Sequence, residues 1–119
     1  MTYEEQHQYD NLSYYQKQDY DRYKSQHPGW SHKQIMFKIG MDKTAEKIVD
    51  RGEDPNPEDP RILKEILEGA KSFLIGVGIV VGTIIAIIDD ALETLGGLIY
   101  EGISYVGNKL QEFWDWLWD

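Results

Sequence analysis

The sequence predicts an all-α protein with a small N-terminal helical module, one long helix that runs into a single membrane span, and a C-terminal amphipathic helix. Three observations lead to this fold class. Residues 72–88 contain no charged side chain. Before and after them, apolar residues recur every three or four positions, which is the period of a helix buried on one side. A helix start is also encoded at Ser31, where Gln34 completes the pattern of a capping box.

Residues 72–88, called the apolar segment below, are the feature around which the chain is organised. Their only polar side chains are the hydroxyls of Ser72 and Thr83. A helix that is apolar on every side must be buried on every side, in lipid or in protein. Crossing a bilayer takes roughly 17 to 25 such residues, so this segment is at the short end. We adopt a membrane span; the alternatives are a helix buried inside a protein assembly and a segment that inserts only when triggered.

Composition narrows the function classes. The 119 residues include no cysteine, which excludes disulfides and thiolate metal sites. The net charge of −9, from 12 basic and 21 acidic residues, argues against nucleic acid and against a polybasic membrane surface. No N-terminal signal peptide is visible, because the first apolar run begins only at residue 72. If the chain is targeted to a membrane, the apolar segment must therefore act as its own signal anchor.

Residues 1–51 are expected to form the N-terminal helical module. Residues 2–26 are polar and rich in Tyr and Gln, and a helix there would place four side chains on one face: Tyr9, Leu12, Tyr20 and Tyr23. This face either packs on the next helix or docks a partner, and packing is the interpretation we adopt. After His27-Pro28-Gly29, a helix is predicted from Ser31 to Gly52.

Residues 52–60 form a proline-rich, acidic linker, and Asp59 and Pro60 have the residue types of an N-cap and a first helical position. The apolar pattern that follows merges without a break into the apolar segment. The sequence therefore predicts one helix over residues 60–88, about 43 Å long at about 1.5 Å per residue. This helix makes up most of the amphipathic-to-transmembrane unit that we assign to residues 61–90.

Residues 91–119 are predicted to form an acidic amphipathic helix. Glu93 and Glu101 would each cost roughly 2.5 kcal/mol or more near a bilayer centre, so this helix is not expected to cross. Its Trp-rich end suits the headgroup region, with three interfacial anchors: Trp114, Trp116 and Trp118. Bases precede the apolar segment and acids follow it, which places the N-terminus in the cytoplasm and the C-terminus outside.

Two groups of residues are candidates for function. Gly78, Gly82 and Ala86 are four positions apart, so on a helix they form one stripe of small residues where a second copy could pack closely. Three carboxylates would follow the end of the span: Asp89, Asp90 and Glu93. In a ring of helices they would surround a pore mouth, and in a monomer they would only mark the end of the span, which is the simpler interpretation.

The sequence shows no pattern of an enzyme or of a metal or cofactor site. His7, His27 and His32 lack zinc-ligand spacing, and neither a phosphate-binding glycine loop nor a nucleophile elbow occurs. We therefore expect no catalytic, cofactor-binding or metal-binding residues.

Two functions remain, and they differ in class. The first is a small single-span protein that partners with the lipid bilayer and with copies of itself, forming a pore or permeabilising the membrane. The second is a non-conducting structural subunit of a larger membrane-associated, virion or secretion assembly, with protein partners bound through residues 60–71 and 91–118. A soluble bundle that buries the apolar segment between copies is a third interpretation. Nucleic acid is not expected as a partner.

Overall fold

The described part of the chain folds into α-helices, which confirms the all-α part of the predicted fold class. The computed structural model describes residues 1–79 and 82–100, and within these ranges no strand occurs. Five helices lie in the described part of the chain: α1 (Tyr3–Asp10), α2 (Tyr14–Gln26), α3 (His32–Asp50), α4 (Pro60–Gly76) and α5 (Thr83–Tyr100).

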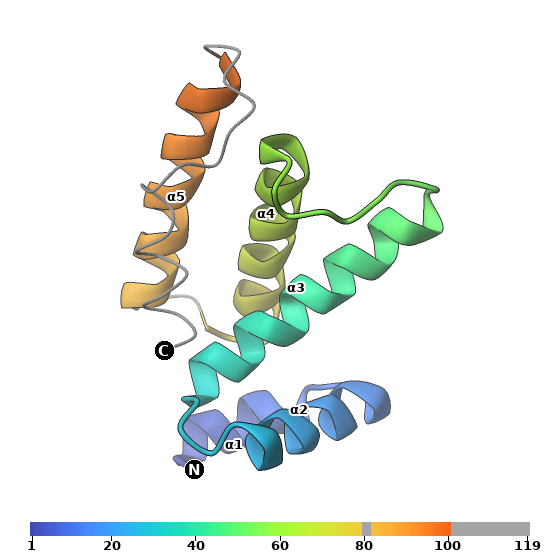
Figure 1. The fold of residues 1–119 in the computed structure, drawn as a ribbon. Helices are drawn as coiled ribbons and strands as arrows, with labels where there is room; N and C mark the ends of the chain where they lie inside the picture. Colours follow the sequence, from blue (N-terminus) through green and yellow to red (C-terminus); the bar gives the residue numbers. More distant parts are fainter. Residues whose placement is uncertain (80–81, 101–119) are drawn as a thin grey trace.

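The described helices pack in two groups that share α3, one with α1 and α2 and the other with α4 and α5 (Figure 1). α1 and α2 lie across the N-terminal end of α3. α3 packs on α4, and α4 and α5 run side by side in opposite directions as a helical hairpin. The connection between α4 and α5 lies at the end of the hairpin nearest α1. The hairpin connection is therefore placed close to the N-terminal helices.

Local capping explains where the first three helices begin. Ser31 accepts a hydrogen bond from the Gln34 backbone N–H, and the Gln34 side chain accepts one from the Ser31 N–H, so the predicted capping box is confirmed. The same reciprocal pairs occur between Thr2 and Glu5 and between Ser13 and Gln16. Because Ser13 starts a new helix, residues 2–26 form two helices.

The prediction that one helical face carries the tyrosines and Leu12 is therefore wrong, because the chain turns between α1 and α2. The turn nevertheless brings Tyr9 of α1 against Tyr20 of α2, with ring centroids 5.1 Å apart in an edge-on arrangement. Tyr20 and Leu12 are buried in the core, and Tyr9 and Tyr23 pack against it. These side chains thus serve packing, which is the interpretation that the sequence favoured.

A glycine ends α3 by a well-defined hydrogen-bond pattern. Gly52 has a φ of 86°, its N–H donates to the carbonyl of Val49, and the N–H of Glu53 donates to the carbonyl of Ile48. These two bonds make a Schellman motif, which satisfies carbonyls at a helix end. The predicted start of α4 is also confirmed, since Asp59 caps the helix and Pro60 is its first residue.

The predicted continuous helix over residues 60–88 is wrong, because α4 ends at Gly76 and α5 begins at Thr83. Gly78 has a φ of 104°, its N–H donates to the Ile75 carbonyl, and the Ile79 N–H donates to the Leu74 carbonyl. This is a second Schellman motif, and both Leu74 and Ile79 are buried. The backbone thus leaves the helical path inside the apolar segment.

The predicted start of the last helix after Asp90 is wrong as well, since α5 already begins at Thr83 and contains Asp89 and Asp90. Residues 101–119, which include most of the predicted C-terminal amphipathic helix, lie outside the described residues.

The hairpin is held by two apolar seams with alternating steps of four and three residues. This spacing keeps side chains of two antiparallel helices in register along their line of contact. The seam of α4 and its C-cap consists of buried residues: Leu63, Leu67, Ala70, Leu74 and the C-cap residue Val77. The seam of α5 consists of Ile84, Ile88, Ala91 and Leu95. Both belong to one core with Ile35, Met36 and Phe37 of α3.

The contact between α3 and α4 requires a glycine at position 69. A Cβ atom added there would lie 2.0 Å from Oγ1 and 2.8 Å from Cβ of Thr44. We expect Gly69→Ala to lower the free energy of unfolding by about 1–3 kcal/mol, the usual cost of overpacking a core contact. Urea denaturation measures this change.

Gly97→Ala in α5 is the matched control, because nothing lies within 4 Å of a Cβ atom added there. It should raise stability by up to about 1 kcal/mol through helix propensity. Equal effects of the two substitutions would contradict the described contact.

Candidate functional site

The candidate site is the apolar segment, which the fold divides between the end of α4, a turn, and the start of α5. An ion pair stands at its two ends, since Nζ of Lys71 lies 2.5 Å from Oδ1 of Asp89. Because these residues immediately flank residues 72–88, the pair joins the two helices where the uncharged part of the hairpin begins. The ion pair therefore lies at the boundary between the uncharged end of the hairpin and the charged remainder of the chain.

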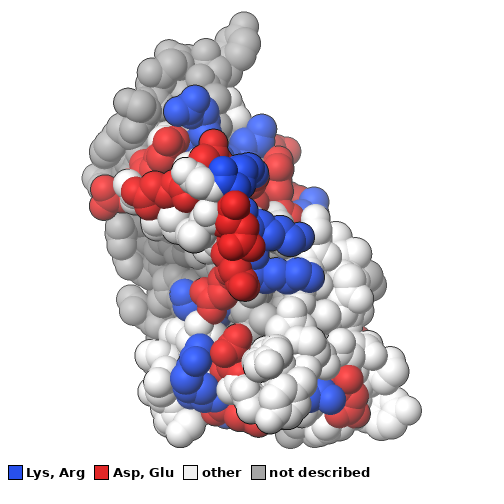
Figure 2. All heavy atoms as spheres, turned by 90° about the vertical axis from the view of Figure 1, so that its right-hand side faces the viewer, with Lys and Arg blue, Asp and Glu red and all other residues white. Residues whose placement is uncertain are grey.

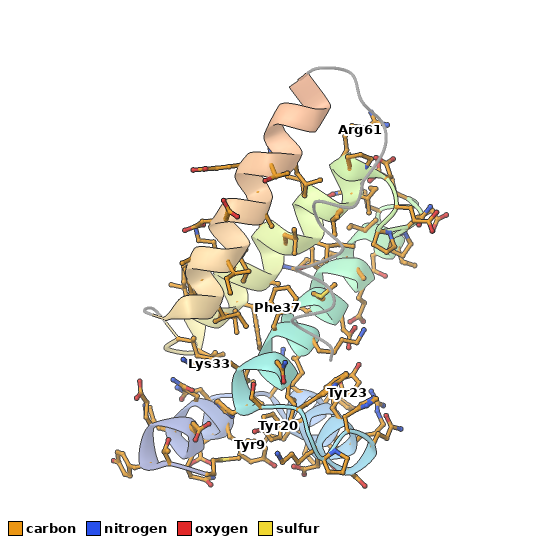
Figure 3. The ribbon with its side chains drawn as sticks, turned by 60° about the vertical axis from the view of Figure 1, so that its left-hand side comes forward. Tyr9, Tyr20, Tyr23, Lys33, Phe37 and Arg61 are labelled. Atoms are coloured by element: carbon orange, nitrogen blue, oxygen red, sulfur yellow. The ribbon has the colours of Figure 1, made fainter. Side chains whose placement is uncertain are left out.

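The turn of the hairpin rests on the N-terminal helices. Nε2 of Gln8 in α1 donates a hydrogen bond of 3.5 Å to the carbonyl of Gly78. Nζ of Lys33 in α3 lies 3.1 Å from the position a Cβ atom would take at Gly82. Figure 3 shows Lys33 beside the connection between α4 and α5. Ile79, the residue after Gly78, is only 3% exposed. The turn is thus covered by side chains of α1 and α3.

Gln8 belongs to a buried chain of hydrogen bonds from three helices, called the His32 network below. Oη of Tyr20 lies 2.8 Å from Nδ1 of His32, and Nε2 of His32 lies 2.8 Å from Oε1 of Gln8. Gln8 then donates to the carbonyl of Gly78. Figure 3 shows Tyr20 between the N-terminal helices and the start of α3.

The direction of each hydrogen bond follows from the carbonyl at the end of the network. Gly78 O can only accept, so Gln8 presents its amide nitrogen to it and its amide oxygen to His32. His32 must then carry its proton on Nε2 and accept the hydroxyl proton of Tyr20 at Nδ1. The network is therefore complete when His32 is neutral.

Burial sets the electrostatics of the network. Burial lowers the pKa of His32 below its ordinary value of 6.5, and Glu5 acts in the opposite direction. Burial also raises the pKa of Tyr20 to about 12, so its hydroxyl keeps its proton at physiological pH. His32 also lines a cleft of about 370 Å³ between α1 and the turn, together with Glu4, Lys33 and Ile79.

The structure does not place the predicted small residues on one helical stripe. Gly78 and Gly82 lie in the turn, with φ values of 104° and 151°, and Ala86 is an exposed residue of α5. The predicted stripe requires a continuous helix through all three positions, and in this fold that requirement is not met. The glycines instead allow a backbone conformation that other residues adopt at a cost.

The three predicted carboxylates lie inside α5 rather than beyond a helix end. Asp89 pairs with Lys71 as described, while Asp90 and Glu93 are exposed. Trp114, Trp116 and Trp118 lie outside the described residues. Within residues 1–79 and 82–100, no group of three potential metal-ligating side chains occurs, and of the histidines His7 and His27 are exposed.

No described helix combines the length and the hydrophobicity needed to cross a bilayer. Comparison with known proteins identifies no relative: no family model, no curated protein and no solved structure matches the chain.

The outer surface presents two further features. On the described part of the face in Figure 2, Lys and Arg side chains lie beside Asp and Glu side chains. Ion pairs on the described surface include Lys38 with Asp42 at 3.0 Å and Arg51 with Glu65 at 2.5 Å. This mixing leaves that face without a large area of one sign. Three tyrosines project into solvent from α1 and α2, namely Tyr3, Tyr14 and Tyr15, which are 91%, 70% and 75% exposed.

The His32 network was not predicted, because its members come from α1, α2 and α3 and share no spacing that sequence could reveal. The turn, in contrast, had a signal. Gly78 is followed by an apolar residue, Ile79, and preceded four positions earlier by another, Leu74. This is the residue pattern of a Schellman motif with its apolar contact.

The turn should be sensitive to a side chain at position 78. We expect Gly78→Ala to lower the free energy of unfolding by about 1–2 kcal/mol, because residues with a Cβ atom pay this cost at a left-handed φ. Thermal or urea denaturation measures the loss. Gly76→Ala is the control two positions earlier, since its Cβ atom would contact nothing. If Gly78→Ala is instead stabilising, a helix continues through this position.

Proposed function

We propose that this chain acts at a lipid bilayer and that the apolar segment is the part that enters the membrane. The Lys71–Asp89 ion pair carries the proposal, because it encloses 17 consecutive uncharged residues. Within them Ile75, although large and apolar, remains 43% exposed. Such a unit is separated from the charged surface and can leave water without carrying a charge into lipid.

In water we expect the apolar segment to remain a hairpin, and in a lipid bilayer we expect it to form one straight helix. Backbone groups in a turn lack partners in hydrocarbon, whereas a helix satisfies all of them internally. A straight helix of 17 residues is about 26 Å long, against a hydrocarbon core of about 30 Å. The remaining mismatch costs only fractions of a kcal/mol per Å. Lys71 and Asp89 would then lie about 27 Å apart, one at each interface.

The straight form also accounts for the small residues. Helical backbone through the turn would place Gly78, Gly82 and Ala86 on one stripe, where copies of the helix associate closely in lipid. Asp89, Asp90 and Glu93 would then surround one end of the assembly and favour cations there. We propose that the associated form opens a pore or permeabilises the bilayer, with the N-terminal helices on the cytoplasmic side.

A second candidate function is a non-conducting structural subunit of a larger assembly. The exposed tyrosines Tyr3, Tyr14 and Tyr15 favour it, because tyrosine combines apolar area with a hydrogen-bonding group and is enriched in protein interfaces. This function predicts stable complexes with other proteins and no release of dye from vesicles by the isolated chain.

A charge inside the apolar segment tests the membrane proposal. Ile75→Asp should weaken binding to phosphatidylcholine vesicles about tenfold, roughly 1.4 kcal/mol, because a carboxylate opposes insertion even away from the helix centre. Vesicle co-sedimentation and dye release are the measurements. Val49→Asp is the control, since Val49 is also apolar and 54% exposed but lies in α3. Equal losses in the two variants would contradict insertion of the apolar segment.

Linking the two ends of the hairpin tests whether it must straighten. The chain has no cysteine, so Lys71→Cys with Asp89→Cys introduces a single pair that a short bismaleimide can bridge. Dye release should fall at least about tenfold on bridging, since a linked pair cannot reach opposite interfaces. The same variant capped with a monofunctional maleimide should retain release.

A bridge between Lys38→Cys and Asp42→Cys, four residues apart in α3, should leave release unchanged. Release by the bridged hairpin at the rate of the capped protein would show that straightening is not required.

A further inference from the structure

The contact between the hairpin turn and α1 depends on a titratable side chain. Gln8 donates to the carbonyl of Gly78 and at the same time accepts from Nε2 of His32. Gln8 and His32 are 5% and 7% exposed, and Tyr20 is 4% exposed. The amide that holds the turn is therefore oriented by the imidazole behind it.

We propose that the His32 network is an acid-sensitive latch, which holds the turn against α1 while His32 is neutral and releases it when His32 gains a proton. The inference rests on the proposed function, because release of the turn is the step that would make the apolar segment available to a bilayer.

The positions of the hydrogen-bonding protons explain why protonation of His32 would release the turn. In the neutral state Tyr20 donates to Nδ1, Nε2 donates to Gln8, and Gln8 donates to Gly78. A second proton on His32 makes Nδ1 a donor that faces the hydroxyl of Tyr20. The hydroxyl must then turn its own hydrogen away into a buried environment, which costs a hydrogen bond.

Hydration of the charged imidazole favours opening at one place. A buried cation costs free energy until water or a counter-charge reaches it. His32 lines the cleft between α1 and the turn, and Gly78 and Ile79 of the turn line it as well. Separation of the turn from α1 widens this cleft, so the same movement that hydrates His32 breaks the bond between Gln8 and Gly78.

The charged groups around His32 act in both directions. On α1, Glu5 stabilises the charged imidazole, and Glu4 lines the same cleft. Lys33 on α3, Lys24 on α2 and the N-terminal amine oppose the charge. Burial and these cations outweigh Glu5, so the pKa of His32 in the folded chain is below 6.5.

The sign of the pH dependence follows from this direction. His32 binds a proton less readily in the folded chain than in the unfolded chain, where its pKa has the ordinary value of 6.5. The latch is therefore fully stable above about pH 6.5, and its stability falls as the pH decreases toward the folded-state pKa.

Two spin labels measure the latch directly in the absence of lipid. Tyr3→Cys on α1 and Ala86→Cys on α5 provide two exposed sites in a chain without other cysteines. The closed state is defined by the distance between the two labels at about pH 7.5. The population at that distance should fall by more than half when the pH is lowered to about 5. The midpoint should coincide with the NMR titration of the His32 ring protons.

Substitution of individual histidines identifies the responsible group. His32→Gln should abolish the pH response of the distance, whereas His7→Gln, at an exposed position of α1, should retain it. Gln8→Leu should give the open distance already at about pH 7.5, and this variant leaves the imidazole in place if His32→Gln does not fold. Coincident midpoints in the unsubstituted network support the latch without any histidine variant.

The failures of the two proposals are distinguishable. A distance that does not respond to pH, or that responds only where carboxylates titrate, overturns the latch whatever happens with vesicles. An acid-dependent distance change without binding to phosphatidylcholine vesicles overturns the membrane function and supports the latch alone. Acid-dependent distance change and vesicle binding with one midpoint, both lost in His32→Gln, support the two together.

Discussion

The fold depends on one constraint, which is that residues 72–88 must be shielded from water because they are uncharged and almost entirely apolar. A single helix of this composition would expose apolar side chains on every side. The chain instead folds back at Gly78, so that the end of α4 and the start of α5 cover one another. α3 packs on α4, α2 packs on α3, and α1 contacts the turn of the hairpin through Gln8. The helices are thus arranged around the hairpin.

The junction between the hairpin turn and the N-terminal helices is polar where the rest of the interior is apolar. Gln8, His32 and Tyr20 each lie buried with a hydrogen-bond partner, and no buried side-chain N or O atom in the described residues lacks one. A satisfied polar contact of this kind defines one orientation of the turn. When either partner is lost, the other is left buried without a hydrogen bond, which costs about 1–3 kcal/mol. A change in the protonation of His32 therefore acts directly on this junction.

Two glycines show where sequence prediction succeeded and where it failed. Gly52 and Gly78 end their helices by the same Schellman hydrogen bonds. Gly52 can be identified from the sequence because it comes just after the last residues of the helical apolar pattern, where a terminating glycine is expected. Gly78 was assigned to a helix interior because apolar residues continue on both sides, and in lipid such glycines are common. The choice between a turn and a helix at this position depends on the surroundings of the segment, which local sequence does not contain.

The sequence alone determined the all-α class, the start of α3 at its Ser31 capping box, the linker and the capped start of α4. These features depend on residues within one turn of each other, so local physical rules suffice for them. Only the tertiary structure decided that the apolar segment forms a hairpin and that Gln8, Tyr20 and His32 meet beside its turn. Those contacts join helices far apart in the chain, and their stability comes from mutual burial, which no single stretch of sequence specifies.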